Sequence, residues 1–240
     1  MIDFHSHFLP AIDDGSDSVE TSLEMLRESR RQGVELMFAT PHFYADEDDP
    51  QSFLQRRNEA YTLLCEAMKA DGGDFPQIML GAEILYFPGI SVADEIVELG
   101  MGATPFLLIE PPMIPWRDSM LDEIEFLGEN YRRIPVIAHV DRYMRLLRDN
   151  TLFDRLAGRH ALIQVNASVF LYRDRLASMA LEYLQQGRIQ FIGSDCHNMD
   201  ERAPNMGDAE QIIRSNGLGG YLDEIHERLY NLLDEIEYEA

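Results

Sequence analysis

Short apolar runs alternate with longer amphipathic stretches along the whole chain. The short runs are bounded by turn residues and rich in Val, Ile, Leu and Phe, which is typical of buried β-strands. Strands that alternate with helices in this way form repeated βα units, and such units build parallel sheets. The pattern predicts seven strands, over residues 2–5, 34–40, 78–83, 106–110, 135–139, 161–166 and 190–194.

Between these strands, apolar residues recur at helical spacing. Val19, Leu23 and Leu26 share one helical face, and Asp17 before them is expected to cap the first turn. Similar patterns predict helices over residues 50–70, 118–131 and 174–186, and along the tail from residue 217. We expect the tail helix to dock on the sheet through its apolar face. Because no low-complexity linker or internal repeat divides the chain, we expect a single α/β domain over residues 1–240.

The chain is strongly acidic, with 20 Lys and Arg residues against 43 Asp and Glu residues and a net charge of −23. Nucleic-acid backbones are polyanions, so this balance argues against a nucleic-acid partner. No apolar run approaches the roughly 18 residues of a membrane-spanning helix, and no signal peptide is evident at the start of the chain. Cys65 and Cys196 form no disulfide or metal-binding pattern. We therefore expect a cytoplasmic protein without membrane insertion.

Side chains that commonly bind metals follow six of the seven predicted strands. The carboxyl ends of parallel strands meet at one edge of a sheet or barrel, where active sites form. The side chains at this edge are His5, His7, His42, Glu83, Glu110, His139, Asp195 and His197. Imidazoles and carboxylates without thiolates suit Mn²⁺, Fe²⁺ or Zn²⁺, and a set of this size exceeds what one ion uses. We therefore expect two or three metal ions.

The motifs around these residues resemble those of the polymerase and histidinol phosphatase (PHP) superfamily. They are MIDFHSH, the Asp13-Asp14-Gly15 turn, TPH ending at His42, GAE ending at Glu83, LLIE ending at Glu110, AHVDRY and GSDCHN. The opening H-S-H, followed by D-D-G, is most similar to the manganese-dependent bacterial protein-tyrosine phosphatases of capsule and exopolysaccharide operons. This resemblance implies a distorted (β/α)7 TIM-like barrel of the PHP type. It also implies a phosphotyrosyl protein as substrate, and a bacterial tyrosine kinase as the enzyme that the phosphatase opposes.

The resemblance further implies a trinuclear Mn²⁺ cluster. By motif position, the three ions would be bound by His5, His7, Glu83 and Asp195, by Glu83, Glu110 and His139, and by Asp14, His42 and His197. Glu83 would bridge the first two ions. Asp13 is adjacent to Asp14, and the sequence leaves open which of the two aspartates reaches the metal.

Arg142, three residues after His139, is the expected phosphate-binding and catalytic residue. Phosphoryl transfer spreads negative charge over the equatorial oxygens, and a guanidinium can donate to two of them. Bridging metals would lower the pKa of a water molecule and supply the attacking hydroxide. Because a phenol has a pKa of about 10, a phenolate leaves more easily than a serine alkoxide, which favours phosphotyrosine as substrate.

Other activities compete with this hypothesis. A small-molecule phosphoesterase of the histidinol phosphatase kind would need a closed pocket, and a non-catalytic regulatory module would bind metal without turnover. An amidohydrolase would need a carbamylated lysine after a strand, but Lys69 is the only lysine and lies in a predicted helix. Cys196 and Arg202 have the C-x5-R spacing of cysteine-dependent tyrosine phosphatases. The loop between them lacks glycine and contains Asp200 and Glu201, which would repel a phosphate.

The loops near the predicted mouth carry acidic and aromatic side chains. The acidic segment 46–49 follows His42, and is interpreted as a solvated loop or as a device against highly anionic substrates. Tyr44 and Trp116 could frame the aromatic ring of a substrate or could simply pack in the core.

Overall fold

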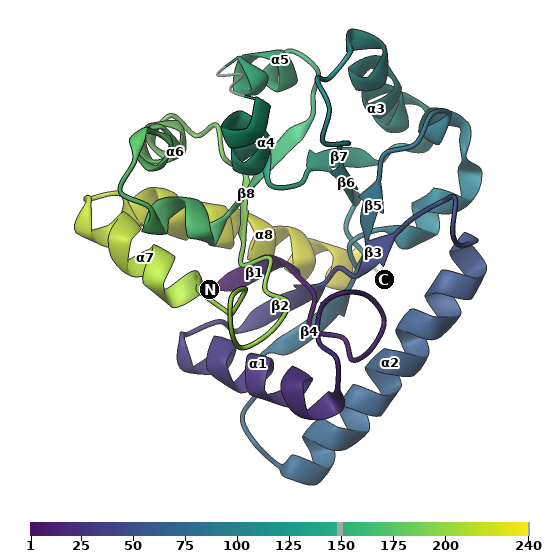
Figure 1. Cartoon of the computed structure of the whole chain (residues 1–240), viewed down its shortest axis with the longest axis vertical. Coiled ribbons are helices and arrows are strands. Elements are labelled where there is room, and N and C mark those ends of the chain that lie inside the picture. Colours follow the sequence, from purple (N-terminus) through teal and green to yellow (C-terminus); the bar gives the residue numbers. More distant parts are fainter. Residues whose placement is uncertain (148–150, 240) are drawn as a thin grey trace.

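The computed structural model describes residues 1–147 and 151–239. It has an α/β fold in which a curled parallel sheet is surrounded by helices (Figure 1). Among the described residues, every pairing between named strands is parallel. The strands are β1 (Ile2–Ser6), β2 (Leu36–Ala39), β3 (His42–Phe43), β4 (Gln77–Leu80), β5 (Glu83–Leu85), β6 (Phe106–Glu110), β7 (Ile134–Ile137), β8 (Leu162–Asn166) and β9 (Phe191–Gly193).

Two breaks in the sheet let the strands change partners. β2 pairs with β1 and β4, whereas β3, which follows β2 directly, pairs with β5. Pro41 lies between β2 and β3, and proline has no N–H to donate to a ladder. Gly81 lies in the second break, where a Cβ would stand only 2.5 Å from Sδ of Met101. These breaks carry β3 and β5 into a second sheet, which continues through β6, β7, β8 and β9.

β1 and β9 meet along a seam that joins the two sheets. The backbone N–H of Asp195 donates to the carbonyl of His5 at 2.8 Å, and Ser6 forms a parallel bridge with Cys196. Gly193 permits this close approach, since a Cβ there would lie 2.5 Å from Cβ of His5. The seam places the first and last strands side by side, and both strands lead into predicted metal ligands.

Each of the seven predicted strand ranges contains a strand, but some details differ. The two-residue β3 lies outside the predicted ranges, and β7 ends before its predicted end at His139. Helices cover all the ranges in which the sequence predicts them. The helices are α1 (Val19–Arg31), α2 (Pro50–Asp71), α3 (Asp118–Tyr131), α4 (Val140–Leu147), α5 (Leu152–Ala157), α6 (Arg175–Gln185), α7 (Met206–Ser215) and α8 (Gly219–Glu239), with short 3₁₀ turns at Ile90–Val92, Asp94–Leu99 and Ala167–Leu171.

Three of these helices, α4, α5 and α7, were not predicted from the pattern, because each spans ten residues or fewer. The predicted cap of α1 was wrong. Ser18 caps that helix by accepting from the Thr21 N–H at 3.2 Å, while Asp17 accepts from the Thr21 hydroxyl at 2.8 Å. No helix among the described residues is long and apolar enough to cross a membrane.

Aromatic side chains fill the interior of the curled sheet. Phe4 of β1 stacks on Phe191 of β9, with ring centroids 3.9 Å apart, and lies 5.1 Å from Phe38 of β2. Phe106 of β6 contacts Phe191 at 5.0 Å, although β7 and β8 separate their strands in the sheet. This contact therefore crosses the interior. Leu229 of α8 belongs to the same cluster, so the tail helix docks on the sheet as expected.

Phe38→Ala is expected to lower the free energy of unfolding by about 3–5 kcal/mol, because it opens a cavity among fully buried rings. Phe126→Ala is the matched control, since this side chain on α3 is 46% exposed. The control should change stability by about 0.5 kcal/mol or less. Urea unfolding followed by circular dichroism measures both values. Equal losses in the two variants would contradict the described core.

Candidate metal centre

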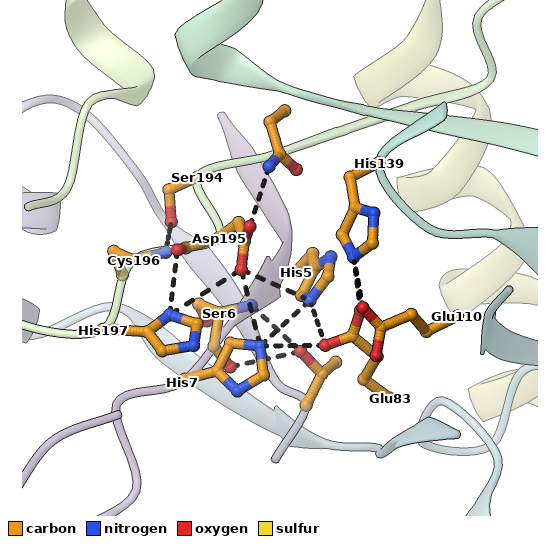
Figure 2. A network of polar contacts seen from close by, with 12 residues as sticks. His5, Ser6, His7, Glu83, Glu110, His139, Ser194, Asp195, Cys196 and His197 are labelled. Carbon is orange, nitrogen blue, oxygen red and sulfur yellow. Dashed lines mark hydrogen bonds and ion pairs between the residues drawn. The ribbon is translucent and has the colours of Figure 1, made fainter. Parts of the chain in front are cut away.

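Nine imidazole and carboxylate side chains meet at one rim of the curled sheet, and Figure 2 shows seven of them. The structure thus brings together every metal ligand that the sequence predicts. Asp14 has a side chain that is 67% exposed, whereas the other eight are between 0% and 12% exposed. They come from β1 (His5), the following loop (His7, Asp14), β3 (His42), β5 (Glu83), β6 (Glu110), the turn after β7 (His139) and the segment after β9 (Asp195, His197).

His5 and His7 direct their Nε2 atoms at each other across 3.0 Å. Both atoms also face Oε2 of Glu83, at 3.1 and 3.2 Å. Oδ1 of Asp195 lies 3.8 Å from Nε2 of His5 and 3.6 Å from Nε2 of His7. Two imidazole lone pairs at this separation repel each other unless a proton or a cation lies between them. The four side chains therefore form a first group of donors.

Glu83 lies at the centre of the whole cluster. Its Oε1 is 2.8 Å from Nε2 of His139, and that nitrogen is 3.4 Å from Oε1 of Glu110. Its Oε2 is 3.2 Å from Nδ1 of His42 as well as close to the first group. A carboxylate with each oxygen in a different group of donors has the arrangement of a bridging ligand.

The two adjacent aspartates face different partners. Asp14 directs Oδ1 at Nε2 of His42 and Nε2 of His197, at 3.4 and 3.3 Å. Asp13 instead pairs Oδ2 with Nδ1 of His7 at 2.7 Å and accepts from the His42 backbone N–H at 3.0 Å. Asp14 therefore adjoins a third group of donors. Asp13 holds the far side of the His7 ring, as carboxylates behind metal-binding histidines commonly do.

The electrostatics of the cluster fit divalent cations. Oε2 of Glu83, Nδ1 of His42 and Nε2 of His197 are buried without a hydrogen-bond partner, which is costly unless a ligand satisfies them. Burial alone would lower the pKa of His7, but the neighbouring carboxylates of Asp13 and Glu83 raise it to about 10. Burial and the charge of His7 lower the pKa of His197 to about 3. Imidazole and carboxylate donors of this kind suit Mn²⁺, Fe²⁺ and Zn²⁺.

Two of the nine residues have strained backbones. His139 has a φ of 33° and Asp195 a φ of 54°. This left-handed region costs a non-glycine residue about 1–3 kcal/mol, and such strain clusters at functional sites. Hydrogen bonds from their backbone N–H groups hold both residues in this conformation. The His139 N–H donates to Oε1 of Gln164, and the Asp195 N–H donates to the carbonyl of His5.

Two arginines donate to different oxygens of the Asp195 carboxylate. Arg142, which the sequence predicts, donates to Oδ2, and Arg202 donates to Oδ1 at 2.7 Å. Their side chains are 31% and 36% exposed, and both line a cavity of about 250 Å³ beside Asp195. Arg202 was not predicted as part of this site. Its only signal in the sequence was the C-x5-R spacing from Cys196.

Cys196 has neither of the properties that a catalytic thiolate needs. Its side chain is completely buried, and this burial, together with the charge of Asp3, raises the pKa of the thiol. A nucleophilic cysteine requires access to substrate and a lowered pKa. The C-x5-R spacing therefore does not indicate cysteine-dependent catalysis here.

The aromatic residues near the mouth have different roles. Trp116 is 6% exposed and packs edge-on against Tyr143, with ring centroids 4.8 Å apart, so it belongs to the core. Tyr44 stacks on His42 at 5.4 Å and stays beside the cluster. Residues from the acidic segment 46–49 line a cavity of about 540 Å³ together with His42 and Tyr44.

Saturating Mn²⁺ is expected to raise the melting temperature of chelator-stripped protein, because cations relieve repulsion among the carboxylates. Free ion at about 100 times its dissociation constant stabilises a protein by about 2.7 kcal/mol per site. Glu83→Gln should lose most of this gain, while Glu98→Gln, at an exposed position that contacts Gln51, should keep it. Differential scanning fluorimetry measures the shift. An unchanged melting temperature in the wild type would contradict the metal centre.

Comparisons with known proteins agree with this geometry. Residues 1–229 match the family described as capsular polysaccharide synthesis, CpsB/CapC. Tyrosine-protein phosphatase CpsB of Streptococcus agalactiae is 30% identical over 230 residues, 89% of each chain. Tyrosine-protein phosphatase YwqE of Bacillus subtilis is 27% identical over 213 residues, 84% of this chain and 79% of its own.

The fold is also similar to a solved structure. A chain from the crystal structures of YwqE from Bacillus subtilis and CpsB from Streptococcus pneumoniae, described as unique metal-dependent tyrosine phosphatases, superposes with a TM-score of 0.83. It is 25% identical, and the match covers 98% of this chain and 94% of that chain. The resemblance drawn from the sequence motifs is therefore confirmed, and this chain belongs to the CpsB/CapC family of capsular polysaccharide synthesis proteins.

Proposed function

We propose that this chain is a metal-dependent protein-tyrosine phosphatase. The observation that carries the proposal is the convergence of nine imidazole and carboxylate side chains beside two partly exposed arginines. The relatives named as tyrosine-protein phosphatases support it. On the strength of the motif resemblance, the proposed substrate is a phosphotyrosyl protein, in particular a bacterial tyrosine kinase; the family's description as capsular polysaccharide synthesis proteins supports that such a kinase controls this synthesis.

The metal site of this proposal holds two or three ions in the three groups of donors described above. Glu83 would bridge two of them, and Asp14 would be the ligand rather than Asp13, because Asp13 already pairs with His7. Manganese is the proposed metal on the strength of the PHP resemblance, while the donor set also suits iron and zinc. When bound, such ions supply hydroxide near neutral pH and polarise the phosphoryl oxygens.

Arg142 and Arg202 would bind the phosphoryl group. Both line the cavity beside Asp195 and stay partly exposed, so a substrate can reach them. A guanidinium donates two parallel N–H groups, which matches phosphoryl oxygens, and it stabilises the charge that builds on them during transfer. Since a phenol has a pKa of about 10, a phenolate leaving group needs less help from a general acid than a serine alkoxide does.

The type of barrel, the domain organisation and the cellular compartment are part of the same proposal. We infer that the curled sheet is a distorted (β/α)7 barrel, which the seam between β1 and β9 and the contact of Phe106 with Phe191 across the interior support. Packing of α8 against β-strand residues supports a single domain over residues 1–240. The two free cysteines and the net charge of −23 support a reducing cytoplasm and a substrate other than nucleic acid.

Chelator-stripped protein should regain hydrolysis of a phosphotyrosyl peptide when Mn²⁺ is added, and a matched phosphoseryl peptide should react far more slowly. The reason is the leaving group, because a serine alkoxide depends far more on protonation than a phenolate does. Phosphate release measures both rates. Hydrolysis of a small phosphate ester such as histidinol phosphate, with neither peptide cleaved, would instead favour the small-molecule phosphoesterase.

Cys196→Ser is the control that separates metal-dependent from thiol-dependent catalysis. It should retain most of the wild-type rate, because the thiol is buried and protonated. Loss of the rate with metal content unchanged would contradict the proposed mechanism.

Arg142→Ala and Arg202→Ala should each lower kcat/KM for the phosphotyrosyl peptide by about 100-fold, the scale of losing one fixed donor to transition-state charge. Metal content, measured by mass spectrometry of the loaded protein, should stay at the wild-type value. Arg188→Ala is the control, because Arg188 pairs with Asp154 at the protein surface. Wild-type turnover in Arg202→Ala would remove this residue from the phosphate site.

A further inference from the structure

A buried amide on β8 lies inside the metal centre without belonging to the predicted ligands. Gln164 has a completely buried side chain. Its Oε1 contacts Nδ1 of His5 at 3.3 Å and accepts from the His139 backbone N–H at 2.5 Å. His5 and His139 belong to different groups of donors, so one amide oxygen contacts both groups.

The orientation of this amide is fixed by its backbone partners. The His139 N–H can only donate, so the atom that faces it must be the amide oxygen. On the other side, Nε2 of Gln164 donates to the Val165 carbonyl at 2.8 Å, which can only accept, and to Oδ1 of Asn166 at 3.1 Å. Exchange of oxygen and nitrogen would break both backbone hydrogen bonds. His5 therefore faces an acceptor.

An acceptor beside Nδ1 determines the tautomer of a neutral imidazole. The proton of His5 must lie on Nδ1, because the Gln164 oxygen accepts but cannot donate. The lone pair of His5 then lies on Nε2, the atom that faces His7 and Glu83. In this tautomer Nε2 of His5 carries no proton, so it can bind a metal ion in the cluster without first losing one.

The same oxygen also holds the strained turn that carries His139. The φ of 33° at this residue is unfavourable, and the bond from its N–H to Gln164 ties the turn to β8. Asn166 continues the connection, since its N–H donates to Oδ1 of Asp141 at 2.9 Å and its Nδ2 donates to Oδ2 of Asp195 at 2.8 Å. β8 thus contacts predicted ligands in the segments that follow both neighbouring strands, β7 and β9.

We propose that Gln164 is a positioning residue that sets the tautomer of His5 and the placement of His139 at once, so that two groups of donors are ready for metal before it arrives. This inference rests on the metal site of the proposed function. It concerns metal binding and is independent of which phosphate ester is hydrolysed.

The test compares three variants of the whole chain by titration of Mn²⁺ into chelator-stripped protein. Gln164→Met keeps the side-chain volume but removes the acceptor, and it should weaken Mn²⁺ binding by about 10- to 100-fold. Gln164→Glu keeps an oxygen acceptor for His5 and His139 but loses the donor to the Val165 carbonyl, so it should recover only part of the affinity that Gln164→Met loses. Gln190→Met is the matched control, because Gln190 bonds backbone groups of Ile163 and Gly187 away from the metal centre.

Wild-type Mn²⁺ affinity in Gln164→Met would overturn the proposal, and so would an equal loss in Gln190→Met. A second measurement needs no variant. In protein loaded with diamagnetic Zn²⁺, ¹⁵N NMR of the imidazoles should find the His5 proton on Nδ1, and a proton on Nε2 would overturn the proposal. If these results hold while no phosphotyrosyl peptide is cleaved, the proposed function fails and the positioning role stands.

Discussion

Glu83 carries a buried carboxylate within 3.2 Å of four imidazoles, those of His5, His7, His42 and His139. Burial alone would raise its pKa, but the surrounding imidazoles hold the pKa well below its usual range. An ionised carboxylate at this depth requires positive charge from several directions. The chain supplies those partners from strands that are far apart in sequence, so the sheet must curl to bring them to one carboxylate.

The breaks in the sheet make that curvature compatible with parallel pairing. After Pro41 and Gly81, β3 and β5 pair with each other, which puts His42 in register with Glu83. Of the remaining side chains, His5 lies in β1 and Glu110 is the last residue of β6, whereas His7, Asp14, His139, Asp195 and His197 lie in the segments that follow β1, β7 and β9. The backbone strain at His139 falls in such a segment. The interior of the curled sheet packs the phenylalanines, while its irregular rim carries the cluster of imidazoles and carboxylates.

Much of this arrangement could be predicted from the sequence, because the ligands follow directly after apolar strand segments. Adjacent residues such as Asp13 and Asp14 could not be distinguished, since their difference depends on which neighbour the loop turns toward. The sequence does not predict Arg202 as a site residue, because its contact with Asp195 depends on how the loop after β9 folds back. In the sequence, Gln164 is one polar residue within an apolar strand segment. Its contacts with His5 and His139 are visible only in the tertiary structure.

The seam between β1 and β9 also has a consequence for biosynthesis. His5 leaves the ribosome early, but the strand that pairs with its carbonyl ends at Gly193, and α8 reaches back so that His226 accepts from the Ile2 N–H across 224 positions. Such long-range closure is slow and comes late in folding. A nascent chain therefore exposes an incomplete set of these side chains until the residues up to His197 have been translated.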